Sequence, residues 1–330
     1  MKANTKYEKG HPGVSRDKAV MVGEIKPKIV LAGGTGFLGG LLAERFKHRY
    51  AITVLSRSPS RFEDGINYVQ WNARTLGDWK KELEGAQILI NLTGKSVDCR
   101  FTDANRKLIL NSRIESTKVL ADAVQKVSNP PALWINAAGA SIYSPSRTNR
   151  STEEDESVGD SFMAQVSKQW EDVLFSSNES LPDIRKVALR ISLILGASGG
   201  VAPKLFRFSR LFLGGSQGSG KQMMSWMHAE DFVSAVEFII NNKGVSGPVN
   251  MASPQAVNNK EFMKALRKAV KRPFGFPAPT PVLRLAAALM GSEPELVLTD
   301  MNVYPEKLLD FGFHFRYPEI KEAVNSIVGE

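Results

Sequence analysis

Residues 28 to 39 read KIVLAGGTGFLG, which is a short apolar run, a glycine-rich turn and the start of an amphipathic segment. The run from Lys28 to Ala32 is rich in Ile, Val and Leu, as buried parallel strands are. The segment from Phe37 to Lys47 places its apolar side chains at helical spacing. A strand, a glycine turn and a helix in this order predict the first unit of a parallel α/β sheet.

The glycine turn predicts a binding site for the diphosphate of a dinucleotide. Gly33 and Gly36 permit a tight turn and a close approach of the backbone to the ligand, and Gly39 permits close packing of helix on strand. The free N–H groups and the positive dipole end of the helix favour an anion at its N-terminus. The residues predicted to line this site are Gly33, Gly34, Thr35, Gly36, Phe37, Leu38 and Gly39.

The end of the next predicted strand, Ile52 to Ser56, indicates which dinucleotide is bound. An NAD site usually places an acidic side chain about 20 residues after the loop to hold the ribose hydroxyls. Here the strand ends in Ser56 and Arg57, and a guanidinium matches the geometry of a 2′-phosphate. We therefore expect NADP(H), contacted by both residues. The alternative for Arg57 is a solvated loop cation, and for Arg61 that alternative is preferred.

The alternation of strands and helices continues to about Gly196 and then loosens. Further strands are predicted at Ile66 to Gln70, Ile88 to Leu92, Leu133 to Ala137 and Val187 to Ile191. Helices are predicted at Thr102 to Val127, Asp160 to Phe175, Glu230 to Asn241, Lys260 to Val270 and Glu319 to Val328. We expect an α/β protein: a Rossmann-type doubly wound parallel sheet with a small α-rich C-terminal substrate-side subdomain. The expected parts are a disordered polar tail (1–26), an NADP-binding domain (27–250, with substrate-side insertions after 196) and a C-terminal module (251–330).

Composition and charge argue against several classes of protein. No apolar run approaches the roughly 20 residues that span a bilayer. The single cysteine, Cys99, excludes an internal disulfide framework and fits a reducing cytoplasm, and no metal site is expected. The net charge of +9 is not gathered into one basic stripe, so we expect no nucleic-acid partner. A third, weaker option is that the basic tail meets a nucleic acid or a membrane surface. A monomer and a homodimer both remain open.

Further motifs carry a resemblance to a known family. They are Asn91 to Gly94, Asn111 to Thr117, Trp170-Glu171, Gly218 to Gln222, Ser225 to His228 with Asp231, and Pro305 to Phe313 followed by Tyr317-Pro318. With these motifs, the sequence from Lys28 to Val328 resembles the extended short-chain dehydrogenase/reductases, in the NAD-dependent epimerase branch. More narrowly, it resembles the "epimerase family protein" group, which carries a C-terminal domain of unknown function.

The resemblance implies several placements around the cofactor. Asn91, Leu92, Thr93 and Gly94 would lie along its ribose and nicotinamide side. Trp71 and Asn72 would lie near the adenine, and Arg113 falls where the superfamily often has an Asn. On the substrate side, the loop from Ser198 to Gly220 is expected to form a lid, with Trp226 as the wall beyond it and His228 nearby.

The catalytic pattern of the superfamily is incomplete in this sequence. Related enzymes place a Tyr four residues before a Lys on one helix, where the Tyr transfers a proton. Here Lys168 is preceded by Ala164 at that spacing. Tyr143 is the first remaining candidate, followed by Ser141, Lys168 and His228.

Each candidate has a structural alternative. Tyr143 would be a packing residue, Lys168 an exposed helix cation, and His228 with Asp231 a contact between a loop and a helix start. Arg113 and Lys95 offer positive charge for an anionic substrate or for the cofactor phosphates, or form surface ion pairs.

Two functions are therefore expected to compete. The first is an NADP(H)-dependent, epimerase-like oxidoreductase acting on an unidentified small molecule. The second is a catalytically silent NADP(H)-binding regulator or scaffold, for example in cell division.

Overall fold

The computed structural model describes residues 26–177, 179–181 and 183–329. The tail predicted to be disordered, residues 1–26, lies outside the described residues except for Lys26. No helix in the described ranges has the length and apolar character needed to cross a membrane.

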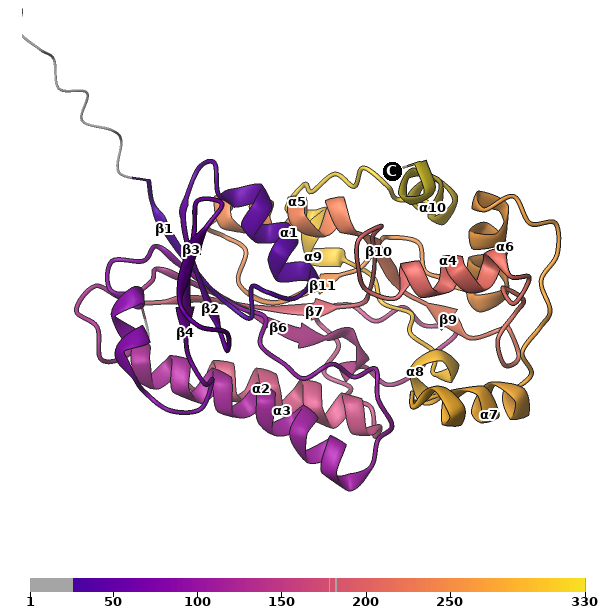
Figure 1. Cartoon of the computed structure of the whole chain (residues 1–330), viewed down its shortest axis with the longest axis horizontal. Helices are drawn as coiled ribbons and strands as arrows, with labels where there is room; N and C mark the ends of the chain where they lie inside the picture. The colour runs from indigo at the N-terminus through magenta and orange to yellow at the C-terminus, as the bar shows by residue number, and fades with distance from the viewer. Residues whose placement is uncertain (1–25, 178, 182, 330) are drawn as a thin grey trace, which may run out of the picture.

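Eight strands form one sheet in the order β11-β7-β6-β5-β1-β2-β4-β3 (Figure 1). In that order they span Gly247–Met251, Arg185–Ile191, Leu133–Gly139, Ile88–Asn91, Lys28–Ala32, Ala51–Ser56, Ile66–Gln70 and Arg61–Glu63. Every neighbouring pair is parallel except β3 with β4. The strand order reverses between β1 and β5, which is the switch point of the sheet. Open α/β sheets bind ligands beside that point. The predicted Rossmann-type fold is confirmed.

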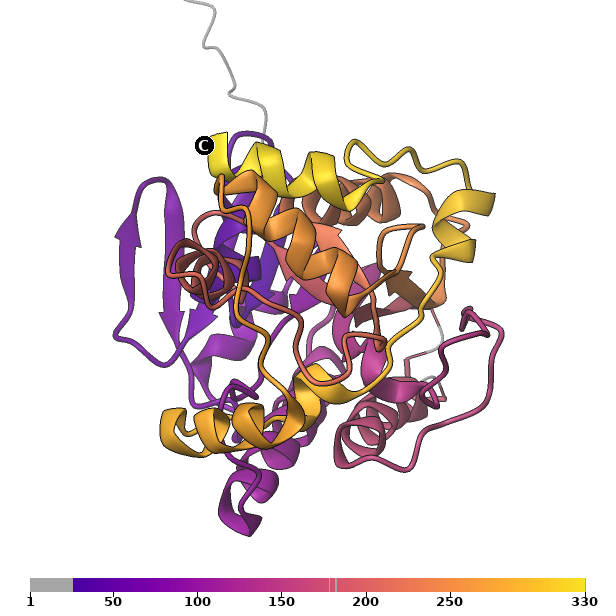
Figure 2. The same cartoon turned by 90° about the vertical axis from the view of Figure 1, so that its right-hand side faces the viewer.

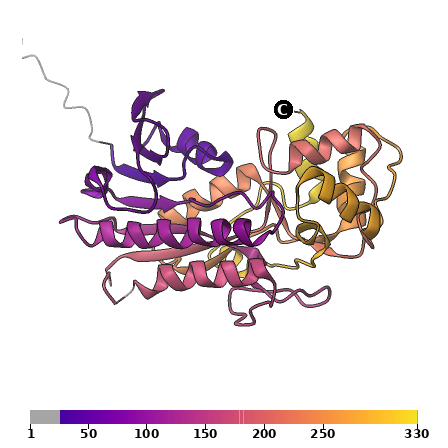
Figure 3. The same ribbon diagram turned by 60° about the horizontal axis from the view of Figure 1, so that its bottom comes forward.

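Two pairs of helices cover the two faces of the sheet. The helices α2 (Asp103–Val124) and α3 (Phe162–Ser176) lie side by side on one face, and α1 (Phe37–Phe46) and α5 (Ala229–Asn241) cover the other (Figures 1 and 3). Each face has its own apolar core, because β-branched and aliphatic side chains point alternately up and down along every strand. The short helices η1 (Asp78–Leu83), η2 (Ala140–Ile142) and α9 (Glu306–Asp310) complete the layers.

A third apolar core belongs to the C-terminal part of the chain. It joins α4 (Ala202–Arg210), α6 (Asn259–Ala269) and α10 (Ile320–Gly329) with β8 (Leu193–Leu195) and β10 (Trp226–His228) (Figure 2). The remaining elements are β9 (Met223–Met224), β12 (Val257–Asn258), α7 (Thr280–Met290) and α8 (Glu295–Leu298). The expected α-rich C-terminal region is present. The sequence analysis did not predict β3, β11, the short strands β8, β9, β10 and β12, or α4.

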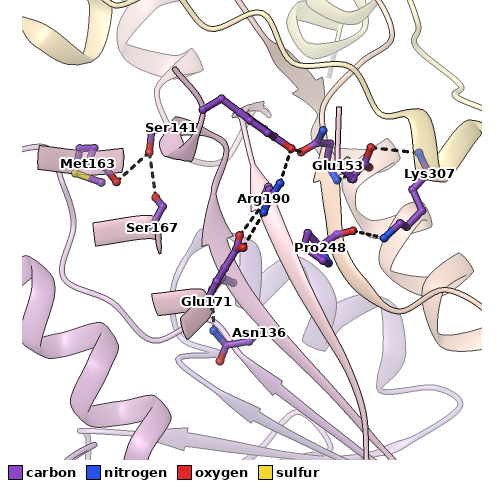
Figure 4. A network of polar contacts seen from close by, with 12 residues as sticks. Asn136, Ser141, Glu153, Met163, Ser167, Glu171, Arg190, Pro248 and Lys307 are labelled. Carbon is purple, nitrogen blue, oxygen red and sulfur yellow. Dashed lines mark hydrogen bonds and ion pairs between the residues drawn. The ribbon is translucent and has the colours of Figure 1, made fainter. Parts of the chain in front are cut away.

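The edge strand β11 is protected against pairing with another chain. The Glu153 carboxylate accepts a hydrogen bond from the Asn250 N–H (2.8 Å), and Lys307 Nζ donates to the Pro248 carbonyl (2.8 Å) (Figure 4). Pro248 itself carries no N–H. These groups take the place of a ninth strand, and they tie the segment around α9 to the sheet.

Candidate functional site

The glycine turn brings the loops after β1 and β5 into backbone contact. Gly33 has a φ of +78°, and a Cβ on it would lie 2.9 Å from the Leu92 carbonyl carbon and from the Thr93 nitrogen. A Cβ on Gly39 would lie 2.5 Å from Gly34 Cα. Any side chain at Gly33 or Gly39 would therefore push the two loops apart or lift α1 from the sheet.

The N-terminus of α1 is open, because no side chain caps it; α4 and α7 also lack a side-chain cap. Its first residue follows Gly36, which has no side chain to accept a hydrogen bond from the first turn. By contrast, Thr102 caps α2 and Ser161 caps α3 with their hydroxyls. A cavity of about 480 Å³ lies at this end of the helix and is lined by Thr35, Gly36, Phe37, Gly40, Leu41, Glu44 and Ser198. The local chemistry, free donors at a positive helix end, suits a phosphate.

Phe37 connects this loop to the turn before α4. A Cβ on Gly196 would lie 2.8 Å from Phe37 Cζ, and one on Gly200 would lie 3.2 Å from its Cε1. The ring therefore packs directly on the backbone of the turn before α4. Leu38, like Phe37, packs against the apolar core beneath α1.

The carboxyl end of β2 presents an unpartnered cation. Ser56 is buried, and its hydroxyl has no hydrogen-bond partner among the described residues. Arg57 is exposed, and its side chain makes no hydrogen bond or ion pair within the described ranges. Arg61 differs, because its guanidinium bonds Glu63 (2.8 Å) and stacks on Tyr68 (3.9 Å). Arg57 is thus the cation left free to meet a ligand at this strand end.

The two residues predicted to lie near the adenine make internal contacts. The ring of Trp71 is buried and meets Trp79 edge to face, with centroids 5.2 Å apart. Asn72 is exposed, and its Oδ1 accepts hydrogen bonds from the N–H groups of Arg74 and Thr75 (both 2.9 Å). These contacts shape the turn after β4, and the adenine placement stays a prediction.

The buried side chain of Asn91 holds the turn after β5 in place. It is fully buried, its Nδ2 donates to Asn136 Oδ1 (2.7 Å) and Thr117 Oγ1 (3.2 Å), and its Oδ1 accepts from the Thr93 N–H. Asn91 therefore positions the backbone of Leu92 and Thr93 instead of offering its own side chain. The Thr93 hydroxyl is buried without a partner among the described residues, as the Ser56 hydroxyl is.

Arg113 lies against the end of the same turn. Its Nη1 donates to the carbonyls of Ile109 (2.8 Å) and Lys95 (3.1 Å), and its guanidinium lies 5.0 Å from the centre of the Trp170 ring. Burial lowers the pKa of Arg113 to about 10. A Cβ on Gly94 would lie 3.1 Å from Arg113 Cζ, so the glycine makes room for the cation.

The hydroxyls after β6 meet helix α3. Ser141 Oγ lies 3.2 Å from Ser167 Oγ and 3.5 Å from the Met163 carbonyl (Figure 4). Lys168 points away from this face and pairs with Asp172 (2.7 Å) at the surface. Ala164 is fully buried. The side chain that α3 brings toward Ser141 is therefore Ser167, and the sequence analysis did not single it out.

Tyr143 belongs to a buried polar network. Its hydroxyl donates to Asn250 Oδ1 (2.8 Å) and accepts from Arg190 Nη1 (2.7 Å). Arg190 in turn holds Glu171 through Nε and Nη2, at 2.8 and 2.9 Å (Figure 4). Burial raises the pKa of Tyr143 to about 12, against the opposing effect of Arg190. These contacts disfavour proton transfer near neutral pH and favour a structural role. The sequence analysis singled out Tyr143 and the Trp170-Glu171 motif separately, and nothing in the sequence indicated that Arg190 joins them.

The two predicted substrate-side residues are buried. Trp226 has no exposed surface, and its Nε1 donates to the Gln255 carbonyl (3.0 Å). His228 accepts from the Glu230 N–H at the start of α5, and its ring stacks on Tyr317 with centroids 4.1 Å apart. Burial lowers the pKa of His228. Their packing disfavours substrate contact, so that role remains only a prediction.

Asp231 completes the anchor that His228 begins. Its two carboxylate oxygens accept from the N–H groups of Arg316 (2.7 Å) and Tyr317 (3.0 Å). The motif thus fastens the segment before α10 to the start of α5. Within the described ranges, no group of three or more His, Cys, Asp or Glu side chains is arranged to hold a metal ion.

Comparison with known proteins places these features in a family. Residues 29–252 match the model of the NAD dependent epimerase/dehydratase family. The chain belongs to this family. Residues 278–327 of this epimerase-family chain match a second model, a domain of unknown function named DUF1731. The resemblance inferred from the motifs is confirmed.

Relatives of this epimerase-family chain match over nearly their whole length. "Epimerase family protein SH2119" of Staphylococcus haemolyticus is 33% identical over 91% of this chain and 99% of its own. "Epimerase family protein YfhF" of Bacillus subtilis is 30% identical over 92% and 98%. The crystal structure of human epimerase family protein SDR39U1 (isoform 2), solved with NADPH, has a TM-score of 0.81 and 28% identity, covering 92% of this chain and 99% of that one.

Proposed function

We propose that this chain binds NADP(H) beside the switch point of the sheet and exchanges a hydride between nicotinamide C4 and an unidentified small molecule. The observation that carries the proposal is the open N-terminus of α1 beside the backbone contact of Gly33 with Leu92 and Thr93. Free N–H groups at a positive helix end bind a diphosphate, and the glycines allow it to approach. The human relative solved with NADPH supports the choice of ligand.

Arg57 is the residue proposed to select NADP(H) over NAD(H). Its free guanidinium stands at the end of β2, where the 2′-phosphate of the adenosine would lie. A guanidinium holds a phosphate through two parallel hydrogen bonds. The buried hydroxyls of Ser56 and Thr93, which have no partner among the described residues, fit ribose or phosphate oxygens at the two ends of the cofactor. The remaining proposed contacts are backbone groups of residues 33–39 and 92–94.

Calorimetry with NADPH and NADH tests the proposal. We expect Arg57→Glu to weaken NADPH binding by about 10- to 100-fold, since one charge-assisted contact is lost and a repulsion is gained. NADH binding should change little. Arg61→Glu is the matched control, because the Arg61 guanidinium is already held by Glu63 and Tyr68. Well-folded wild-type protein that binds neither nucleotide would refute the proposal.

Hydride transfer needs its own measurement. Stereospecifically deuterated NADPH, incubated with the protein and a metabolite extract, should pass its label to a product. Absence of label transfer under every condition would contradict turnover while leaving the cofactor site intact.

A second candidate function is a cofactor-binding regulator without chemistry. Three observations favour it: Ala164 stands where the superfamily has its Tyr, Lys168 is paired with Asp172, and the Tyr143 hydroxyl is fully engaged. For such a regulator, a partner should be captured with NADPH present, lost without it, and lost in Arg57→Glu. For such a regulator, no deuterium should pass from labelled NADPH to a product.

A further inference from the structure

Arg113, half-buried in the middle of α2, differs from the two arginines of β7, Arg185 and Arg190, which are also withdrawn from solvent. Arg190 saturates one edge of its guanidinium with the Glu171 carboxylate. Arg185 donates to carbonyls at and just after the end of α5, including Ile239 (3.2 Å) and Val245 (2.7 Å). Arg113 uses only Nη1, which donates to Ile109 and Lys95. A guanidinium has five N–H donors, so three of those of Arg113 remain.

The unused donors of Arg113 form one edge. Nε and Nη2 make no hydrogen bond within the described residues, and no acidic side chain there pairs with the guanidinium. This edge is the one that binds a carboxylate through two parallel N–H···O bonds. A desolvated cation without a counter-ion is costly. The stacking of the guanidinium on Trp170 and the two carbonyls fix its position but leave the charge uncompensated.

The position of Arg113 assigns this edge to the substrate end of the crevice. The guanidinium lies against Gly94, at the end of the turn after β5, and over Trp170 of α3. Trp170 lies one helical turn beyond Ser167, which meets Ser141 after β6. The open N-terminus of α1 follows β1, and Arg57 follows β2. Both lie on the other side of the point between β1 and β5 where the strand order reverses, and the cofactor phosphates are proposed to bind there.

We propose that Arg113 recognises the substrate and that the substrate carries a carboxylate, bound side-on to Nε and Nη2. This proposal rests on the proposed function, because it assumes that NADP(H) fills the rest of the crevice. Lys95 adds a second positive charge to this end. Its backbone carbonyl accepts a hydrogen bond from Arg113, and its ammonium makes no hydrogen bond or ion pair in the described part of the chain.

The test uses full-length protein saturated with NADPH, so that the phosphate-binding groups are occupied. Oxamate is the carboxylate probe, and oxamide is its uncharged analogue. Calorimetry should show oxamate binding to the wild type, while oxamide should not bind. Arg113→Met should weaken oxamate binding by about 10- to 100-fold, and Arg113→Lys should lose part of it, because an ammonium keeps the charge but not the two-point geometry.

Two controls separate recognition from folding and from cofactor binding. Arg106→Met removes another α2 arginine, whose Nε bonds the Phe101 carbonyl, and should leave oxamate affinity unchanged. NADPH affinity should stay within about threefold in every variant. A second readout is the NMR signal of the Arg113 Nε–H, identified by its loss in Arg113→Lys, which should shift on adding oxamate to the wild type.

The outcomes are distinct. If the wild type binds NADPH but not oxamate, or if oxamide or Arg113→Met binds as tightly, carboxylate recognition by Arg113 is refuted and the cofactor proposal stands. If the wild type does not bind NADPH, both proposals fail together.

Discussion

Replacing Tyr143 by Phe separates a structural tyrosine from a catalytic one. The change removes only the hydroxyl, which accepts from Arg190 Nη1 and donates to Asn250 Oδ1. In the variant, Arg190 keeps its two bonds to Glu171, and Asn250 Nδ2 keeps its bond to the Tyr304 carbonyl. The variant therefore leaves one buried donor and one buried acceptor without a partner.

The expected cost follows from those two groups. A buried polar group left unpaired costs about 1–3 kcal/mol, and more where one partner is charged. Because both residues keep other bonds, we expect the free energy of unfolding to fall by about 2–4 kcal/mol. Tyr143 has its pKa raised to about 12, against an ordinary value near 10, by burial. Its contribution is therefore complete below pH 10 and is lost as the pH rises through 12.

Urea unfolding followed by tryptophan fluorescence measures the change, at pH 7 and at intervals up to pH 11. Tyr304→Phe is the matched control, because the Tyr304 hydroxyl makes no hydrogen bond within the described residues. NADPH affinity should be the same in wild type and both variants. If Tyr143→Phe keeps full stability but abolishes deuteride transfer from NADPH, the structural interpretation is wrong and Tyr143 takes part in the chemistry.

Two further changes test the loop and the C-terminal anchor. Gly39→Ala should lower NADPH affinity at least tenfold and destabilise the protein by about 1–3 kcal/mol, because its Cβ would lie 2.5 Å from Gly34 Cα. Gly40→Ala is the control and should not destabilise the protein, because its Cβ would meet nothing within 4 Å. Equal losses of stability in the two variants would contradict this packing. His228 has its pKa lowered by burial, so the stability that it contributes is present above about pH 6.5 and is lost as the pH falls through the lower folded value. His228→Asn keeps a capping side chain, and its unfolding free energy should depend less on pH between 6.5 and 5 than that of the wild type; identical profiles would show that His228 is not the titrating group.

The sheet could be predicted from the sequence because its signals are local. Runs such as Lys28 to Ala32 and Ile88 to Leu92 are short, aliphatic and followed by turns, and both lie in the sheet as expected. The strand β3 was missed because its three residues, Arg61–Glu63, are all exposed and carry no apolar periodicity. The short strands of the C-terminal part depend on pairing between distant segments, such as β10 with β8, and neither member indicates its partner.

The site could be predicted only where backbone geometry decides it. The need for glycine at positions 33 and 39 is visible in the sequence, because the glycine pattern specifies a close approach. Side-chain roles were less visible, since they depend on burial. Asn91 and His228 are polar residues in family motifs, yet both are buried and hold other parts of the chain in place. No local pattern distinguishes a buried polar brace from a ligand contact.

The packing of α3 shows that one substitution would not restore the Tyr and Lys pair of the superfamily. Ala164 is fully buried, so a phenol ring at position 164 would have to displace the side chains packed around it. Lys168 faces Asp172 at the surface. In our proposal, Arg113 of α2, which stacks on Trp170 of α3, supplies the positive charge that the superfamily places on this helix. A cation held in that way has a fixed, two-pronged edge in place of a mobile ammonium, and such an edge is suited to orienting a carboxylate.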